Sequence, residues 1–207
     1  HKQVHTLMVH THPAGHLYNT KREVKKLSDL KGLKIRIPNR MVSEALKIYG
    51  GVPVAGPVTQ LRNGLAKGVF DGTGFTDEAV YNFKIGKFIK FVTHIPGGLY
   101  NTSFFGVMNK KAWNKISKAD QKTVMGLSGA AYSARLGKAW DRYEAAAPAK
   151  LKAGGTKYHT ISGTALADAR QKLAPFERNW LAKAKAKGVD GVAALKMFRA
   201  EVAAYGS

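Results

Sequence analysis

The sequence contains no cysteine. This absence excludes a disulfide framework, a cysteine-ligated zinc site and a thiol nucleophile. The chain also lacks an apolar run long enough to cross a bilayer, because its most apolar stretches, such as residues 103–108, have only the length of a strand. Hydrophobic residues still make up 44% of the 207 positions, which is ordinary for a globular protein. The length therefore allows one large domain or two small lobes.

Acidic residues are scarce. The chain has 13 Asp+Glu against 34 Lys+Arg, a formal net charge of +21. Such a charge is typical of nucleic-acid-binding proteins. The lysines are scattered, however, with local clusters only at 21–34 and 183–187, and the chain has no zinc-finger spacing, RNA-binding aromatic motif or recognition-helix pattern. We therefore expect no nucleic-acid partner and keep a basic nucleic-acid-binding protein as the alternative function. The same charge would attract small anions to a cleft.

Catalytic and metal-binding patterns are also missing. His10 and His12 would share one face of a strand, but no nearby carboxylate or cysteine completes a set of metal ligands. Asp71 and Glu78 could pair as acid and base, yet turn and capping roles are the simpler interpretation. No Ser-His-Asp order, nucleophile elbow or phosphate-binding glycine loop occurs. We expect neither an enzyme, nor a cofactor, nor a metal site.

The elements that the pattern does predict alternate between strands and helices. Alternating apolar residues and turn signals predict strands over 4–10, 33–37, 69–72, 88–94, 102–108 and 157–161. Helical periodicity and caps predict helices over 43–49, 59–67, 117–152, 165–186 and 191–205, with Ser117 as an N-cap. This order indicates an α/β fold with a largely parallel sheet and helices packed on it from the second half.

One strand carries a candidate anion-binding residue. Arg36 lies between Ile35 and Ile37. It is either an exposed arginine on an edge strand or a guanidinium aimed into a cleft at the carboxyl end of the strand, where ligands of open α/β sheets bind. The planar guanidinium can donate two parallel hydrogen bonds to a carboxylate. The aromatic residues Tyr100, Phe104 and Phe105 are expected in the core.

Several stretches, taken in order, resemble one protein family. Residues 24–38 read VKKLSDLKGLKIRIP, Gly51–Val54 reads GVPV, and residues 67–72 read KGVFDG. Met108-Asn109 is followed by Trp113, Ser117 and Asp120-Gln121, and LKAGG stands at 151–155. This ordered set covers nearly the whole chain and resembles the DctP-like solute-binding proteins of TRAP transporters.

The resemblance implies a fold and a division of the chain. It implies a periplasmic-binding-protein-like α/β lobe of type II-like architecture, with a long spanning helix and C-terminal helices. Residues 1–101 would form the lobe with the carboxylate-binding strand, 102–153 a strand and the spanning helix shared with another lobe, and 154–207 a strand and helices that return to the first lobe. Family members are about half as long again, so the N-terminal lobe is expected to be largely missing from this chain.

The resemblance also implies a ligand and a site. A periplasmic protein would capture a small organic acid and deliver it to TRAP membrane subunits, with homodimerisation open. Arg36 would clamp the carboxylate and Asn101 would hydrogen-bond it. Histidine instead of arginine at position 16 argues against sialic acid. The remaining ligand-binding positions implied are His16, Val58, Thr73 and Phe75.

Overall fold

The computed structural model describes residues 3–205, which form two compact units that divide between Ser162 and Gly163. In the first unit the strands are β1 (Val4–Thr11), β2 (His16–Asn19), β3 (Lys34–Ile37), β4 (Val52–Ala55), β5 (Gly72–Phe75), β6 (Phe91–His94), β7 (Ser103–Asn109) and β8 (Lys157–Thr160). Its helices are α1 (Arg40–Ile48), α2 (Leu61–Ala66), α3 (Asp77–Asn82), α4 (Lys110–Trp113), α5 (Lys118–Gly126) and α6 (Gly129–Ala153). Short 3-10 helices span Leu27–Leu30, Val58–Gln60 and Gly86–Phe88.

Six strands of the first unit form a mixed sheet in the order β4-β3-β5-β2-β6-β8. Strands β4, β3 and β5 are mutually parallel, as are β6 and β8, whereas β2 runs antiparallel to both of its neighbours. The prediction of a largely parallel sheet is therefore wrong for strand β2. Strand β2 has only four residues after the turn at Pro13 and was not predicted.

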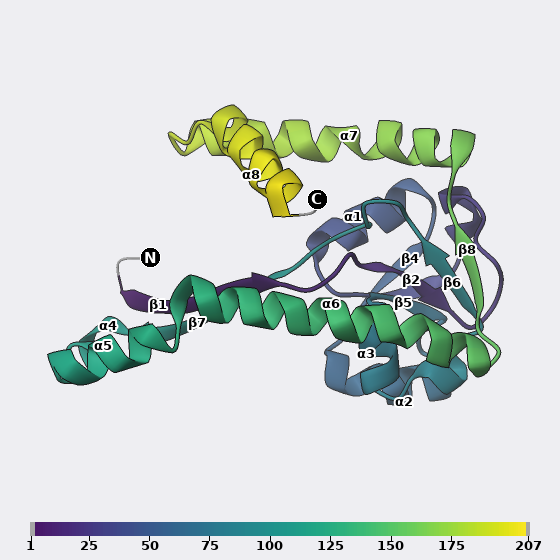
Figure 1. The fold of residues 1–207 in the computed structure, drawn as a ribbon. Coiled ribbons are helices and arrows are strands. Elements are labelled where there is room, and N and C mark those ends of the chain that lie inside the picture. The colour runs from purple at the N-terminus through teal and green to yellow at the C-terminus, as the bar shows by residue number, and fades with distance from the viewer. Residues whose placement is uncertain (1–2, 206–207) are drawn as a thin grey trace. The chain divides into compact units, whose positions relative to one another are not determined.

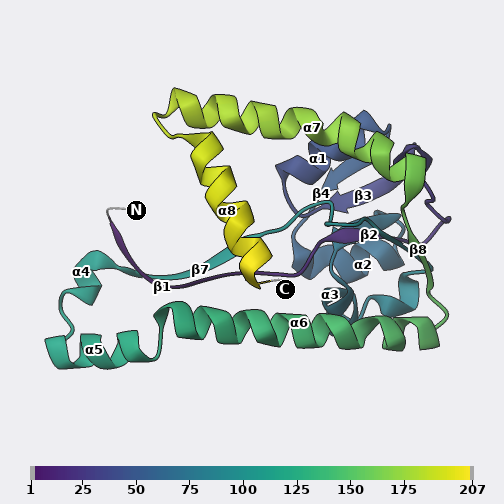
Figure 2. The ribbon, with the colours of Figure 1, turned by 45° about the horizontal axis from the view of Figure 1, so that its top comes forward.

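Right-handed crossovers place helices on both faces of this sheet. The chain moves outward from β3 through α1 to β4 and then back across β3 through α2 to β5. These opposite directions put α1 on one side of the sheet and α2 and α3 on the other, as Figures 1 and 2 show. Strands β3, β4 and β5 are parallel, so their carboxyl ends lie at the same edge of the sheet.

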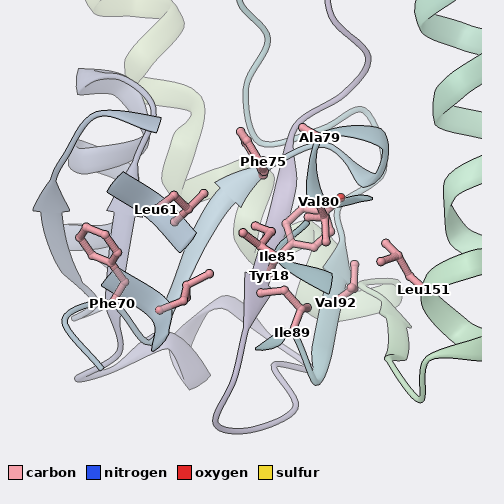
Figure 3. Packing of buried hydrophobic residues seen from close by; sticks show 11 residues of the cluster. Tyr18, Leu61, Phe70, Phe75, Ala79, Val80, Ile85, Ile89, Val92 and Leu151 are labelled. Carbon is pink, nitrogen blue, oxygen red and sulfur yellow. The ribbon is translucent and has the colours of Figure 1, made fainter. Parts of the chain in front are cut away.

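The core on the α2–α3 side is formed by apolar residues from the sheet, both helices and the end of α6 (Figure 3). Tyr18 of β2 and Val80 of α3 are fully buried within it, and Leu151 of α6 is 4% exposed. The sheet is tight at Gly72, where an added Cβ would lie 2.2 Å from the Tyr18 carbonyl oxygen. Glycine at this position lets β5 approach β2 closely.

Strands β1 and β7 form a separate antiparallel ribbon, with an irregularity between Thr6 and Met8. Helix α6 packs along β1 with one part of its length and against α3 with another, and it runs beside the ribbon in Figures 1 and 2. The helix thus connects the ribbon with the wall of the sheet domain.

The single helix predicted over 117–152 is wrong. Ser117 does cap a helix, with its Oγ accepting from the Asp120 amide at 3.1 Å, but that helix, α5, ends at Gly126. Gly129 has a φ of 70°, in the left-handed region, which starts α6 in a new direction. Helix α6 then continues without interruption through Pro148.

The second unit consists of α7 (Gly163–Ala186) and α8 (Gly191–Tyr205). The turn between them follows Gly188, which has a φ of 71°. Gly191 packs against Trp180 and Leu181, and Arg199 of α8 pairs with Glu177 of α7. Both helices were predicted from the sequence. Among the described residues, no helix combines the length and hydrophobicity that a membrane span requires.

Candidate functional site

Arg36 lies at the centre of the candidate site. It is the third residue of β3 and pairs with Thr73 of β5 and Val54 of β4. Ile35 is fully buried on the opposite face of the strand, because successive side chains of a strand alternate. Arg36 itself is only 7% exposed. The structure thus selects the cleft interpretation of Arg36 over an exposed edge-strand arginine.

The guanidinium of Arg36 is oriented by the backbone. Its Nε donates to the carbonyl oxygen of Gly56 at 3.0 Å. Burial lowers the pKa of Arg36 from its usual value, and the nearby Tyr100 opposes this shift, but an arginine remains protonated in any protein. In the described part of the chain, Arg36 forms no ion pair with a carboxylate. A buried, unpaired guanidinium is costly unless an anion joins it.

Arg36 faces a cavity of about 520 Å³, a size typical of small-molecule sites. Most of the wall is apolar or aromatic. Its charged residues are Arg36 and Glu78, and it also contains His12. The lining residues are His12, Arg36, Pro38, Val58, Phe75, Thr76, Glu78, Ala79, Asn82, Phe83, Tyr100, Thr102, Phe104 and Trp140.

Aromatic rings form two groups in this wall. The rings of Phe104 and Trp140 are stacked at 6.1 Å, and those of Phe75 and Phe83 meet at 5.4 Å. Tyr100 is buried beside Arg36, and burial raises its pKa, so its hydroxyl stays neutral. Flat apolar walls around one cation suit a carboxylate attached to a flat apolar body.

His12 lies between these aromatic rings, with its ring 5.2 Å from that of Tyr100. Its Nδ1 lies 2.5 Å from the carbonyl oxygen of Pro13. Burial lowers the pKa of His12, while this hydrogen bond and the charge of Glu78 oppose the shift. Because a carbonyl only accepts, Nδ1 carries the proton of the neutral ring.

Three of the six predicted site residues line the cavity: Arg36, Val58 and Phe75. Asn101 is exposed, and its Nδ2 donates to the carbonyl oxygen of His12 at 2.5 Å. The fully buried Thr73 donates its hydroxyl to the Gly74 carbonyl oxygen, and His16 stacks on His94 at 4.2 Å. The ligand-binding roles of Asn101, Thr73 and His16 remain predictions.

Other residues that line the cavity were predicted to have different roles. Tyr100 is buried as predicted but lines the cavity, whereas Phe104 and Phe105 are 39% and 65% exposed, so their prediction as core residues is wrong. Strand β7, which carries them, pairs only with β1 in the two-stranded ribbon. Glu78 was assigned to capping. Its position just beyond the carboxyl end of β5 was the signal available for a site residue.

The histidines considered as metal ligands lie among aromatic rings. Within residues 3–205, no group of three or more His, Asp or Glu side chains is arranged to hold a metal ion. His10 and His12 instead pack against aromatic rings of Phe104 and Trp140.

Comparison with solved structures places this arrangement among solute-binding proteins. A TRAP periplasmic solute-binding protein from Bordetella bronchiseptica, with bound (R)-mandelate and (S)-mandelate, is 36% identical and superposes with a TM-score of 0.91 over 98% of this chain and 64% of that one. A marine metagenome TRAP solute-binding protein, described as specific for aromatic acid ligands and bound to metahydroxyphenylacetate, is 29% identical, with a TM-score of 0.88 and the same coverage.

Sequence comparisons agree with the structural ones. The "Outer membrane transporter protein TsaT" of Comamonas testosteroni is 27% identical over 203 residues, which are 98% of this chain and 60% of that protein. The chain therefore spans less than two thirds of the length of these relatives. The α/β fold class, matching a lobe of TRAP solute-binding proteins, is confirmed. Residues 1–184 match the DctP family, described as "Bacterial extracellular solute-binding protein, family 7", and the chain belongs to this family.

Proposed function

We propose that this chain is the carboxylate-binding part of a periplasmic protein. That protein captures a small aromatic acid and delivers it to the membrane subunits of a TRAP transporter. The observation that carries the proposal is the buried guanidinium of Arg36, which has no carboxylate partner among the described residues and faces an aromatic cavity. The chain binds its ligand without chemical turnover.

The choice of an aromatic acid rests on two supports. The cavity wall contains Phe75, Phe83, Tyr100, Phe104 and Trp140, whose flat faces favour a ring over an extended aliphatic chain. The similar proteins from Bordetella bronchiseptica and the marine metagenome hold aromatic acids. Membership of the family supports delivery to a transporter and a periplasmic location.

The first test is titration calorimetry of the purified chain with aromatic and aliphatic monocarboxylates, for the wild type and Arg36→Ala. We expect aromatic acids to bind more tightly, and Arg36→Ala to weaken binding by at least about 100-fold, or about 3 kcal/mol, because it removes one partner of a buried charge pair. The ligand should be recovered unchanged.

Arg40→Ala is the matched control. Arg40 is exposed and pairs with Glu44, and its replacement by alanine removes the same charge. Equal affinity of wild type and Arg36→Ala for every acid bound would refute the assignment of Arg36. Duplex DNA in the same panel tests the alternative function suggested by the net charge of +21. Salt-sensitive DNA binding together with no response to any acid would favour that alternative.

A further inference from the structure

Glu78 is a second buried charged group in the ligand cavity. It is the second residue of α3, is 5% exposed and lines the same cavity as Arg36. Within the described residues it forms no ion pair. A buried carboxylate without a cation is costly, so its place in a mostly apolar wall needs an explanation.

The hydrogen bonds of Glu78 leave it able to accept another donor. Its Oε1 accepts from the Thr76 hydroxyl at 3.0 Å, and its Oε2 accepts from Asn82 Nδ2 at 2.7 Å. Both oxygens therefore act as acceptors. Each oxygen has a second lone pair, so Glu78 can accept a further hydrogen bond from a group inside the cavity.

His12 adds to the acceptor character of this part of the cavity. With the ring proton on Nδ1 directed to Pro13, the neutral ring leaves Nε2 without a proton. His12 and Glu78 line the same cavity. The cavity thus combines one cation, Arg36, with an anion and a neutral acceptor.

We propose that the ligand is a monocarboxylate that also carries a hydrogen-bond donor, a hydroxyl or an ammonium group, and that Glu78 accepts this donor while Arg36 holds the carboxylate. This inference rests on the proposed function. A ligand without a donor leaves the remaining lone pairs of Glu78 desolvated and without a donor. A second carboxylate on the ligand would meet a like charge in a site with little water, which disfavours dicarboxylates.

The test uses ligands that share one skeleton and differ in one substituent. Phenylacetate, mandelate, phenylglycine and phenylmalonate carry hydrogen, hydroxyl, ammonium and carboxylate on the same carbon. Benzoate, 3-hydroxybenzoate, 3-aminobenzoate and isophthalate extend the comparison to the ring, although the aniline nitrogen of 3-aminobenzoate is a neutral donor. Affinities are measured by calorimetry for the wild type and Glu78→Gln, with both enantiomers of the chiral acids.

In the wild type we expect a donor-bearing acid of one series to bind at least about tenfold more tightly than its plain parent, and the diacid to bind most weakly. In Glu78→Gln the diacid should gain affinity relative to the donor-bearing acid. A hydroxyl ligand should keep part of its advantage, because glutamine still accepts a hydrogen bond. An ammonium ligand should lose nearly all of its advantage, because it needs the charge.

Glu44→Gln is the control, because Glu44 lies half-exposed on α1, outside the cavity, and undergoes the same change of charge. The inference is overturned if plain parents bind the wild type as tightly as donor-bearing acids in both series, or if Glu78→Gln leaves the ranking unchanged. Failure of every monocarboxylate to bind would overturn the proposed function as well. The wild-type ranking is decisive even if Glu78→Gln does not fold.

Discussion

At the residue scale, the wall of the cavity depends on a glycine outside it. Gly15 donates its amide to the Tyr100 carbonyl oxygen at 2.9 Å, and its own carbonyl oxygen accepts from the Leu99 amide at 2.8 Å. A Cβ on Gly15 would lie 2.1 Å from Cε1 of the Tyr100 ring. Because Tyr100 lines the cavity beside Arg36, any side chain at position 15 must displace this ring.

Gly15→Ala should therefore weaken the binding of an aromatic acid by about tenfold and lower the free energy of unfolding by about 1–3 kcal/mol, since overpacking forces a ring away from its preferred position. Calorimetry and chemical denaturation measure the two effects. Gly137→Ala is the control, because its Cβ would meet nothing within 4 Å on α6 and alanine favours a helix. Unchanged affinity in Gly15→Ala would contradict the role given to Tyr100.

Individual residues show what a sequence pattern can and cannot predict about a site. Arg36 was predicted as a ligand residue from the family resemblance, because the strand pattern alone also allowed an exposed arginine on an edge strand. His12 was not predictable, because its environment is created by Tyr100, Phe104 and Trp140, which come from distant parts of the chain. Residues gathered by tertiary packing leave no local spacing to recognise.

At the element scale, α3 is held in place by a carboxylate from another helix. Thr76 stands at the N-cap position, but its hydroxyl donates to Glu78 and does not cap the helix. The amides of Asp77 and Glu78 donate instead to the two carboxylate oxygens of Glu144 on α6, at 3.1 and 2.8 Å. Burial raises the pKa of Glu144, and these two amides oppose the shift. These two hydrogen bonds, which we call the clamp, join the long helix to the wall of the cavity.

Glu144→Ala should lower the free energy of unfolding by about 1–2 kcal/mol, because it leaves two amides at the start of a helix without acceptors. It should also weaken ligand binding, since Glu78 and Ala79 of α3, and Thr76 just before it, line the cavity. Denaturant titration and calorimetry check both. Glu44→Ala, which removes an exposed ion pair, should cost below about 0.5 kcal/mol. Equal effects of the two substitutions would rule out the clamp.

The elements themselves were predicted unevenly, for physical reasons. Helices α7 and α8 have glycine boundaries and clear periodicity, so their ranges followed from the sequence. Strand β2 has four residues, and three of them are buried, so it has no alternation to detect. The break between α5 and α6 depends on Ser128-Gly129, a weak turn signal inside a strongly helical stretch. Strand direction depends on tertiary pairing, which local patterns do not encode.

At the scale of the whole molecule, the excess of positive charge has a local concentration next to the ligand cavity. A second cavity of about 600 Å³ is lined by Arg62, Lys84, Lys87 and Lys150. None of these four cations forms an ion pair with another described residue. Asn82 lines both cavities. Anions drawn to this basic cavity therefore arrive beside the ligand site.

Replacing Lys84, Lys87 and Lys150 together by glutamine should slow association with a carboxylate by about three- to tenfold at low salt, and leave dissociation nearly unchanged, because rim charges act on encounter. Stopped-flow measurements over a range of salt concentrations check this. The control replaces the exposed lysines Lys110, Lys111 and Lys115, which lowers the net charge equally. If both variants slowed association equally, the net charge and not the basic cavity would be responsible.

The clamp on α3 also separates two tasks within one short helix. Glu144 holds the helix through main-chain amides, which every residue type except proline provides at positions 77 and 78. The part of α3 in recognition at the cavity is left to side chains, among them the one at position 78. A protein engineer could therefore exchange that side chain to redirect the protein to another class of acid while the scaffold around Arg36 stays as it is.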